Sequence, residues 1–467
     1  MRTTRSQRRL AVIVLLICRL PAYSETLTVG HGEGFDHQTI AAALVASAWG
    51  DTILVAAGIY SSTSGELFPL EMKSGVTLIS EAADSQTHIL GDCVHSVFAS
   101  EDVDSATVAG FKISSGSATR GGGIYIISST VAMIDCSIMY NQAQFRGGGI
   151  YAENASTTLE RCTISSNESV PGGHGGGMYC SNSVLSLRRC TVSDNSADGT
   201  GGIVHLGGIT SIHRCTISGN RYGGFAGGGT VCMEDSWVVD NEGRGVACSG
   251  SLRIARCVIS RNVGINGGGI DCGGENTEVL NCLISENVSL FSPGGGIMSV
   301  LSSPSLENCT IVDNQAESGG GVFSAFDKPA LKSCILWGNT PEEISFDKVG
   351  DIDVFYSTVE DGWEGVGNID VDPLFVDPAG GDFRLQADSP CIDSASVDGP
   401  ATDILGNPRP IDIPGVGWEG PGAFDMGAYE FQPPIIQDPQ SDINEDGIVN
   451  AMDLLILLRD WQKVTGP

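Results

Sequence analysis

The stretch RGGGIYAENASTTLERCTISSN, residues 146–167, decides the fold because the chain repeats its pattern nine times. A glycine triplet is followed by alternating apolar residues, a Cys, an Ile two positions later and an Asn three positions after that. The Cys recurs every 21 to 28 residues, with Ser236 taking its place once, at Cys136, Cys162, Cys190, Cys215, Cys257, Cys282, Cys309 and Cys334. A period in this range predicts a solenoid in which each repeat buries its apolar face on its neighbours.

Two kinds of solenoid fit this period. The segment LERCTISSN also satisfies the leucine-rich-repeat skeleton, in which the chain returns through a helical or extended convex segment. Here the return begins with glycine triplets, which are poor helix starts, and the residues after them alternate between apolar and variable types. We therefore expect a second inward-facing strand and predict an all-β fold, a right-handed parallel β-helix of about a dozen coils.

Two inward columns follow from the last glycine of each cluster. We expect the first to contain Ile124, Ile150, Met178, Ile203, Thr230, Val246, Ile270, Ile297 and Val322. We expect the second to contain Ile126, Ala152, Cys180, His205, Cys232, Cys248, Cys272, Ser299 and Ser324. Each residue should lie directly above its own copy, because neighbouring strands are about 4.8 Å apart.

The Asn column is expected to form a hydrogen-bonded ladder along the rod. Its members are Asn141, Asn167, Asn195, Asn220, Asn241, Asn262, Asn287, Asn314 and Asn339. The cysteines are expected to be small buried apolar residues. Disulfides between adjacent coils remain possible from the spacing, and so does a soft-metal site at Cys180, His205 and Cys232, but parallel stacking points these side chains alongside one another, which favours neither.

Composition and charge limit the possible functions. Residues 1–24 combine a basic start, an apolar run and a small-x-small end, which predicts a secretory signal peptide and an extracellular or cell-surface protein. Without its five arginines the chain has 20 Lys and Arg against 56 Asp and Glu. This balance argues against nucleic acid and anionic membranes as partners. No other apolar run is long enough to predict a membrane span.

Three segments carry family resemblances. Residues 36–80, with DTILVAAGIY, resemble the opening of pectin-lyase-like β-helix proteins, in which a short helix caps the rod before the first coil. The repeated GGGI more weakly resembles the repeats of polymorphic outer-membrane and adhesin passenger proteins. Residues 370–430, with TDILGNPRPIDIPG and DMGAYEF, resemble the closing segment of choice-of-anchor surface proteins. We expect a β-helix with its N-terminal cap at 25–345, the β-helix end and closing segment at 346–431, and a linker at 432–440.

The sequence DINEDGIVNAMD, residues 442–453, has oxygen-bearing groups at calcium-loop spacing and Gly447 at the sharp turn. The expected calcium ligands are Asp442, Asn444, Asp446, the Ile448 carbonyl, Asn450 and Asp453. The segment resembles a type I dockerin repeat, which implies a small α module at 441–467 and a cohesin-like partner. Dockerins carry two such loops and this sequence shows one, so the alternative is a calcium-stapled tail that serves attachment or export.

The resemblance to pectin-lyase-like proteins also raises the question of catalysis. Such rods cleave acidic polysaccharides with clustered carboxylates, yet no outward cluster of that kind is evident, and the catalytic residues remain unknown. His174, in a Gly-His-Gly stretch similar to that of galacturonases, has no accompanying Asp-Asp pair and is expected to be a loop residue. Tyr125, Tyr151 and Tyr179 form an outward column that could offer a platform for sugar rings or a partner, or could simply stack to stabilise the coils.

We therefore expect a secreted or cell-surface β-helix protein with a structural or carbohydrate-binding role. The alternatives are a polysaccharide lyase or glycoside hydrolase, and an adhesin-like surface rod.

Overall fold

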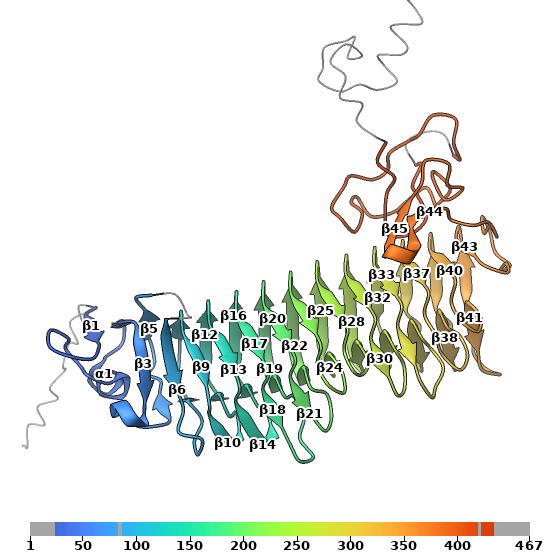
Figure 1. The fold of residues 1–467 in the computed structure, drawn as a ribbon. Helices are drawn as coiled ribbons and strands as arrows, with labels where there is room; N and C mark the ends of the chain where they lie inside the picture. Colours follow the sequence, from blue (N-terminus) through green and yellow to red (C-terminus); the bar gives the residue numbers. More distant parts are fainter. Residues whose placement is uncertain (1–23, 83–85, 419–421, 434–467) are drawn as a thin grey trace, which may run out of the picture.

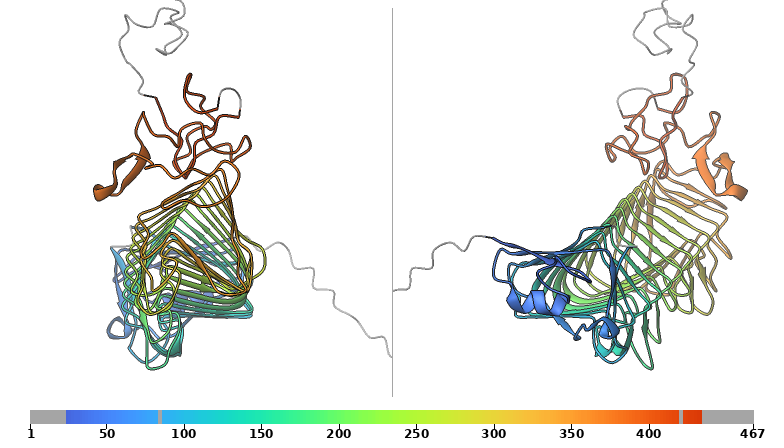
Figure 2. Two further views of the ribbon diagram at one scale, coloured as in Figure 1. Left: turned by 90° about the vertical axis from the view of Figure 1, so that its right-hand side faces the viewer. Right: turned by 60° about the vertical axis from the view of Figure 1, so that its left-hand side comes forward.

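The computed structural model describes residues 24–82, 86–418 and 422–433. Within them the chain winds into a rod of stacked coils (Figure 1), with a three-sided cross-section when viewed along its axis (Figure 2). One wall is a parallel sheet of 13 strands, one from each coil, which confirms the predicted solenoid of about a dozen coils.

The 13-stranded sheet contains the Ile that follows each Cys. Its strands are β3 Gly58–Ser61, β6 Thr87–Leu90, β9 Lys112–Ser114, β13 Ser137–Met139, β17 Thr163–Ser165, β20 Thr191–Ser193, β23 Thr216–Ser218, β26 Trp237–Val239, β29 Val258–Ser260, β33 Leu283–Ser285, β37 Thr310–Val312, β40 Ile335–Trp337 and β43 Thr358–Val359. Ile164 is buried at the centre of β17 and lies between Ile138 and Val192 in register. Strict alternation along each strand thus places one apolar residue per coil in the core.

A second, 24-stranded sheet bends to form the opposite side of each coil, with two strands from most coils. The strands nearest the site described below are β19 Met178–Arg188, β22 Ile203–His213, β24 Phe225–Gly227, β25 Thr230–Glu234, β27 Val246–Cys248, β28 Ser251–Ala255 and β31 Ile270–Cys272. The third side is interrupted and consists of β10 Ser117–Arg120, β14 Gln142–Arg146, β18 Glu168–Ser169 and β21 Ser196–Ala197, and then of β30 Val263–Gly264 and β34 Val288–Ser289.

The Asn ladder is confirmed. The Asn167 Nδ2 atom donates to Asn195 Oδ1 at 3.0 Å, and Asn195 Nδ2 donates to Asn220 Oδ1 at 3.0 Å. The same oxygens accept the backbone N–H of the preceding Asn, at 3.0 Å for Asn167 and 3.1 Å for Asn195. Each amide therefore satisfies buried backbone groups at the corner as well as its own neighbour.

The Asn ladder ends at Asn339. There the Glu343 carboxylate accepts the hydrogen bonds that the side chain of a following Asn accepts in the earlier coils. The Asn339 backbone N–H donates to Glu343 Oε1 at 2.9 Å, and Asn339 Nδ2 donates to Glu343 Oε2. Desolvation raises the pKa of the Glu343 carboxyl to about 8, against the lowering effect of the Asn339 hydrogen bonds.

A raised folded-state pKa makes stability depend on pH. Between its unfolded pKa near 4.5 and its folded pKa of about 8, Glu343 holds a proton only in the folded state, so the free energy of unfolding falls as pH rises through this window. We expect the Glu343→Gln variant to lose part of this slope when unfolding is measured from pH 5 to pH 8.5. An unchanged slope would contradict the assignment.

Both predicted inward columns are wrong in a single coil. Phe225, not Thr230, stacks between Ile203 and Val246, because β24 pairs with β22 and β27. Thr230 instead pairs with Ile209, and Cys232 with Ser211. This coil contains two glycine runs, and the nearer one, Gly223 and Gly224, makes the corner. Cys232 therefore lies outside the column that contains Cys180 and His205.

The rod is capped at its start by α1, Ile40–Ala46, whose side chains Ile40, Ala43 and Leu44 are buried on the first coil. The Thr39 side chain accepts the Ala42 N–H at 3.2 Å, and the Glu66 carboxylate accepts the N–H groups of Ile40 and Ala41 at 2.6 and 3.1 Å. Both side chains thus satisfy otherwise unpaired donors at the helix N-terminus. The short helix predicted before the first coil is present.

The closing segment, residues 370–431, packs on the outer face of the 13-stranded sheet near its C-terminal end (Figure 1). Its side chains Phe375, Phe383, Ile392, Phe424 and Met426 bury the outward residues Leu283, Val312 and Ile335. In earlier coils the corresponding outward residues are the polar Thr163, Thr191 and Thr216. The outward face therefore turns apolar where the closing segment covers it.

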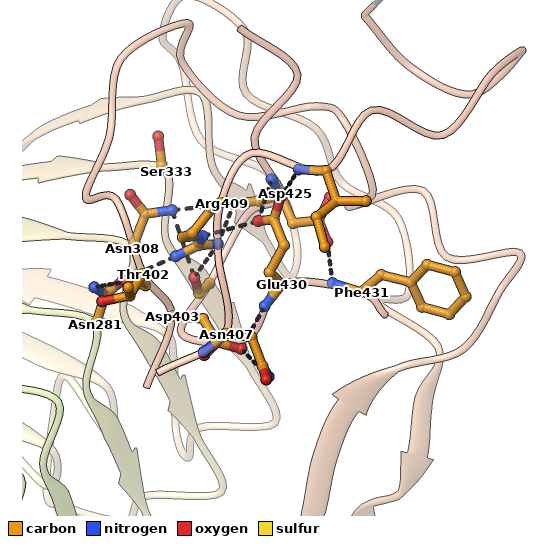
Figure 3. Close-up of polar contacts among 12 residues, drawn as sticks. Asn281, Asn308, Ser333, Thr402, Asp403, Asn407, Arg409, Asp425, Glu430 and Phe431 are labelled. Atoms are coloured by element: carbon orange, nitrogen blue, oxygen red, sulfur yellow. Dashed lines mark hydrogen bonds and ion pairs between the residues drawn. The ribbon is translucent and has the colours of Figure 1, made fainter. Parts of the chain in front are cut away.

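Arg409 fixes this segment to the rod, as Figure 3 shows. Its side chain and that of Glu430 are both fully buried and form an ion pair of 2.8 Å. The guanidinium also donates to Asn281 Oδ1 on the rod at 2.8 Å and to the carbonyls of Asp425 and Gly427 at 3.0 and 3.1 Å. Arg409 and Glu430 thus hold the closing segment against the rod.

Candidate functional site

A groove of about 550 Å³ opens where two neighbouring coils are unusually short. Only four residues, 221–224 and 242–245, connect Asn220 and Asn241 to the next strand, whereas seven residues make this connection in the coils on either side, at 196–202 and 263–269. The longer turns form the walls of the hollow and the short turns form its floor. Its volume lies in the range of ordinary small-ligand sites.

Charged side chains line the floor of the groove. The Arg244 Nη1 atom lies 2.8 Å from Asp271 Oδ2, and the Arg221 guanidinium lies 4.0 Å from Glu242 Oε2. Asp271 projects from β31 and is not itself a lining residue of the groove, and desolvation raises the pKa of its carboxyl despite the opposing effect of Arg244. The floor therefore offers the guanidinium groups of Arg221 and Arg244 as hydrogen-bond donors and the Glu242 carboxylate as an acceptor.

Tyr222 on the floor and Ile265 on a wall of the groove present exposed apolar surface. Tyr222 is 44% exposed and Ile265 is 55% exposed. The Arg221 guanidinium lies over the Tyr222 ring, 5.1 Å from its centroid. Ile265 is followed on the next coil by Phe291, which is 69% exposed and donates its N–H to the Ile265 carbonyl at 3.2 Å. Charged groups beside exposed apolar side chains suit a ligand with both hydroxyl groups and a hydrocarbon face.

His174 also lines this groove, on the turn that precedes it. Its ring packs against Gly199, where an added Cβ would lie 2.1 Å from the His174 Nδ1 atom. No hydrogen bond from the imidazole to another described residue is present in the structure. His174 could not be grouped with Arg221 and Arg244 from the sequence, because the grouping depends on the lengths of four consecutive turns.

The Tyr125, Tyr151 and Tyr179 side chains form the predicted column. Their rings stack with centroids 5.7 and 5.6 Å apart and interplanar angles of 10° and 7°. Tyr151 and Tyr179 are only 1% and 2% exposed. This burial favours the stacking interpretation of the column over that of a ligand platform, a role that stays a prediction. Beyond the tyrosines the column continues through Val204 and Ala226.

The family model for the right-handed β-helix region matches residues 85–207 and 201–353. The chain belongs to the right-handed β-helix family. This match confirms the predicted handedness, and the short coils of the groove lie inside the matched region of this β-helix protein. A search among curated proteins finds no match.

Several solved structures resemble the β-helix protein. The pectate lyase Pel9A is 14% identical, with 88% of this chain and 97% of that chain covered and a TM-score of 0.40. The A-module of mannuronan C-5 epimerase AlgE6 from Azotobacter vinelandii is 13% identical, with coverage of 71% and 93% and a TM-score of 0.38. The polygalacturonase from Erwinia carotovora ssp. carotovora is 12% identical, with coverage of 75% and 98% and a TM-score of 0.35. Likenesses at this level carry no argument about activity.

Among the described residues no group of three or more His, Cys, Asp and Glu side chains is placed to hold a metal ion. Cys180 and His205 pair in register, but Gly227 follows His205, so the three-residue soft-metal site with Cys232 does not form. All 14 cysteines in the described part of the chain are free.

Other predictions fall on residues outside the described ranges. These include the calcium ligands Asp442, Asn444, Asp446, Ile448, Asn450 and Asp453, and the signal peptide up to residue 23. A helix with the length and apolar character needed to cross a membrane is not found in the ranges that are described.

Proposed function

We propose that this chain is an extracellular glycan-binding rod whose ligand lies in the groove formed by the two short coils. The observation that carries the proposal is the amphipathic character of this groove. Arg221, Arg244 and Glu242 supply charged hydrogen-bonding groups, and Tyr222 and Ile265 supply exposed apolar surface beside them. Sugar rings combine hydroxyl groups with a hydrocarbon face, so such a groove can contact both.

The test compares two exposed tyrosines in the same backbone conformation. Tyr222 in the groove has φ 63° and Tyr140 outside it has φ 56°, and both are exposed. An array of plant and bacterial cell-wall oligosaccharides identifies the strongest ligand, whose affinity is then measured by calorimetry. We expect Tyr222→Ala to weaken binding by about tenfold, which corresponds to about 1.4 kcal/mol of lost contact, and Tyr140→Ala to leave it unchanged. Absence of binding by the wild type, or equal losses in both variants, would refute the proposal.

A second candidate is a polysaccharide lyase or glycoside hydrolase acting at the same groove. It is favoured by one observation, the half-buried Asp271 carboxyl that lies 2.8 Å from Arg244 of the groove and has a raised pKa, because a shifted carboxyl next to a cleft is a common property of acid–base catalysts. Chromatography of the same oligosaccharide after incubation distinguishes the candidates. Shorter products indicate catalysis, and intact ligand indicates binding alone.

Attachment is proposed on sequence grounds. The calcium-loop spacing of Asp442, Asn444, Asp446, Ile448, Asn450 and Asp453 supports a calcium-dependent module with a cohesin-like partner or a cell-surface component. The basic and apolar start of the chain supports export. An adhesin-like rod remains a further alternative that differs mainly in its partner.

A further inference from the structure

The tripeptide Arg-Cys-Thr occurs three times, at residues 161–163, 189–191 and 214–216. The three threonines pair in register on adjacent coils, in β17, β20 and β23. The three arginines have nearly the same backbone conformation, with φ of 52°, 54° and 55°. Arg161, Arg189 and Arg214 therefore occupy one corner of the rod at the coil spacing of about 4.8 Å.

Elsewhere on this corner, an Asp on one coil pairs with an Arg on the next. The Asp135 carboxylate holds Arg161 at 2.7 and 2.8 Å, and Asp235 Oδ1 lies 2.6 Å from Arg256 Nε. Arg189 and Arg214 break this pattern because an Arg, not an Asp, precedes each of them on the corner. Within the described ranges, neither forms an ion pair.

The neighbouring Arg188 also lacks an ion pair with any residue that the structure describes, and Arg188, Arg189 and Arg214 are all exposed. Arg188 lies in register with His213 of β22. A hollow of about 230 Å³ beside them is lined by Ser186, Arg188, Ser211, His213 and Glu234, among others. Three guanidinium groups without an ion pair thus lie close together, although acidic residues outnumber basic ones in the chain by 56 to 25.

The acidic residues near these arginines already have partners. Glu234 contacts Arg253 and Arg256, and Glu160 contacts Arg161 at 2.5 Å. Like charges on adjacent coils repel each other, and the nearest carboxylates, Glu160, Glu234 and Asp235, are each held by another Arg. An oxyanion bound from outside would relieve that repulsion.

We propose that the arginine ladder, Arg188, Arg189 and Arg214, binds the sulfate or carboxylate groups of an acidic glycan chain that runs along the rod. A guanidinium presents a planar fork of donors that matches both groups. The half-buried Thr191 and Thr216 hydroxyl groups beside the ladder add neutral hydrogen-bonding partners. The net negative charge of the rod does not prevent this contact, because charges beyond about 8 Å are screened at physiological ionic strength.

The ladder is separate from the groove. It lies at the corner between the 24-stranded and 13-stranded sheets, whereas the groove lies on the turns that follow the Asn column. The outward face beside the ladder is polar and lies in coils before those that the closing segment covers. The proposal therefore stands independently of the proposed function.

Binding to three immobilised polymers tests the proposal at physiological salt: dextran sulfate, polygalacturonate and neutral dextran. We expect the wild type to bind at least one of the two charged polymers and not neutral dextran. The double variant Arg189→Gln/Arg214→Gln is expected to lose at least about tenfold in affinity. The stronger of the two charged polymers identifies sulfate or carboxylate as the group recognised.

The matched control is Arg261→Gln/Arg384→Gln, which changes the net charge equally. These arginines pair with Asp240 and Asp382 outside the ladder. The control should retain wild-type affinity, and Tyr222→Ala in the groove should also leave polyanion binding unchanged. Failure of the wild type to bind either charged polymer, or equal losses in the two double variants, would overturn the proposal. Thermal unfolding of each variant verifies that it is folded.

Discussion

Replacing Arg409 with Met is expected to destabilise the closing segment by about 3–5 kcal/mol. The substitution leaves Glu430 buried without its cation and removes the hydrogen bonds to Asn281 and to the carbonyl of Asp425. An uncompensated buried carboxylate is among the most costly defects in a folded protein, and Asp425, whose pKa is raised by desolvation and by the Glu430 charge, lies beside it.

Native-state hydrogen exchange of the closing-segment amides measures this effect locally, which matters because a long repeat rod need not unfold in one step. Their exchange should accelerate by a factor of about 100 to 5,000, corresponding to the stated free energy. The control is Arg384→Met, which removes an exposed ion pair with Asp382 in the same segment and should cost less than about 1 kcal/mol. Equal effects of the two variants would show that the buried pair does not hold the segment.

Replacing Asn220 with Ala is expected to cost about 3 kcal/mol in the coils on either side. Asn220 Oδ1 accepts hydrogen bonds from the backbone N–H and the Nδ2 of Asn195, and its own Nδ2 donates to the Val192 carbonyl at 2.9 Å and to Asn241 Oδ1 at 3.0 Å. Alanine leaves several of these buried groups unpaired, and each such group costs about 1–3 kcal/mol before relaxation.

The exchange of amides in β20 and β23 reports this loss. Asn266→Ala is the matched control, because Asn266 is exposed and its side chain forms no hydrogen bond with another described residue. We expect amide exchange to be faster in Asn220→Ala than in the wild type, mainly in the adjacent coils. In the control we expect the exchange rates of the wild type. Unchanged protection in Asn220→Ala would mean that the ladder contributes nothing beyond the apolar stack.

Much of the fold could be predicted because each coil rests on a near copy of itself. The spacing from Cys162 to Ile164 and Asn167 recurs along the chain, so the inward Ile and the Asn ladder follow from periodicity alone. The prediction of the inward column was wrong at Thr230 because one coil contains two glycine runs. Only the pairing of Phe225 with Ile203 shows which run makes the corner.

The site was less predictable, although two signals were present in the sequence. The 21-residue intervals on both sides of Ser236 mark the short coils, but a hollow forms only because the neighbouring turns are longer. The residue directly after the Cys is polar in the coil of Thr216 and apolar in the later coils of Val258 and Leu283. This change marks the surface that the closing segment covers. Recognising either signal requires knowing which distant segments lie side by side, and a single repeat does not contain that information.

A crystal structure of the protein with the strongest-binding oligosaccharide tests the central claim, that the two short coils create the ligand site. We predict a sugar ring against Tyr222, within hydrogen-bonding distance of Arg221 or Arg244. A sugar bound elsewhere on the rod, with this groove empty, would contradict it.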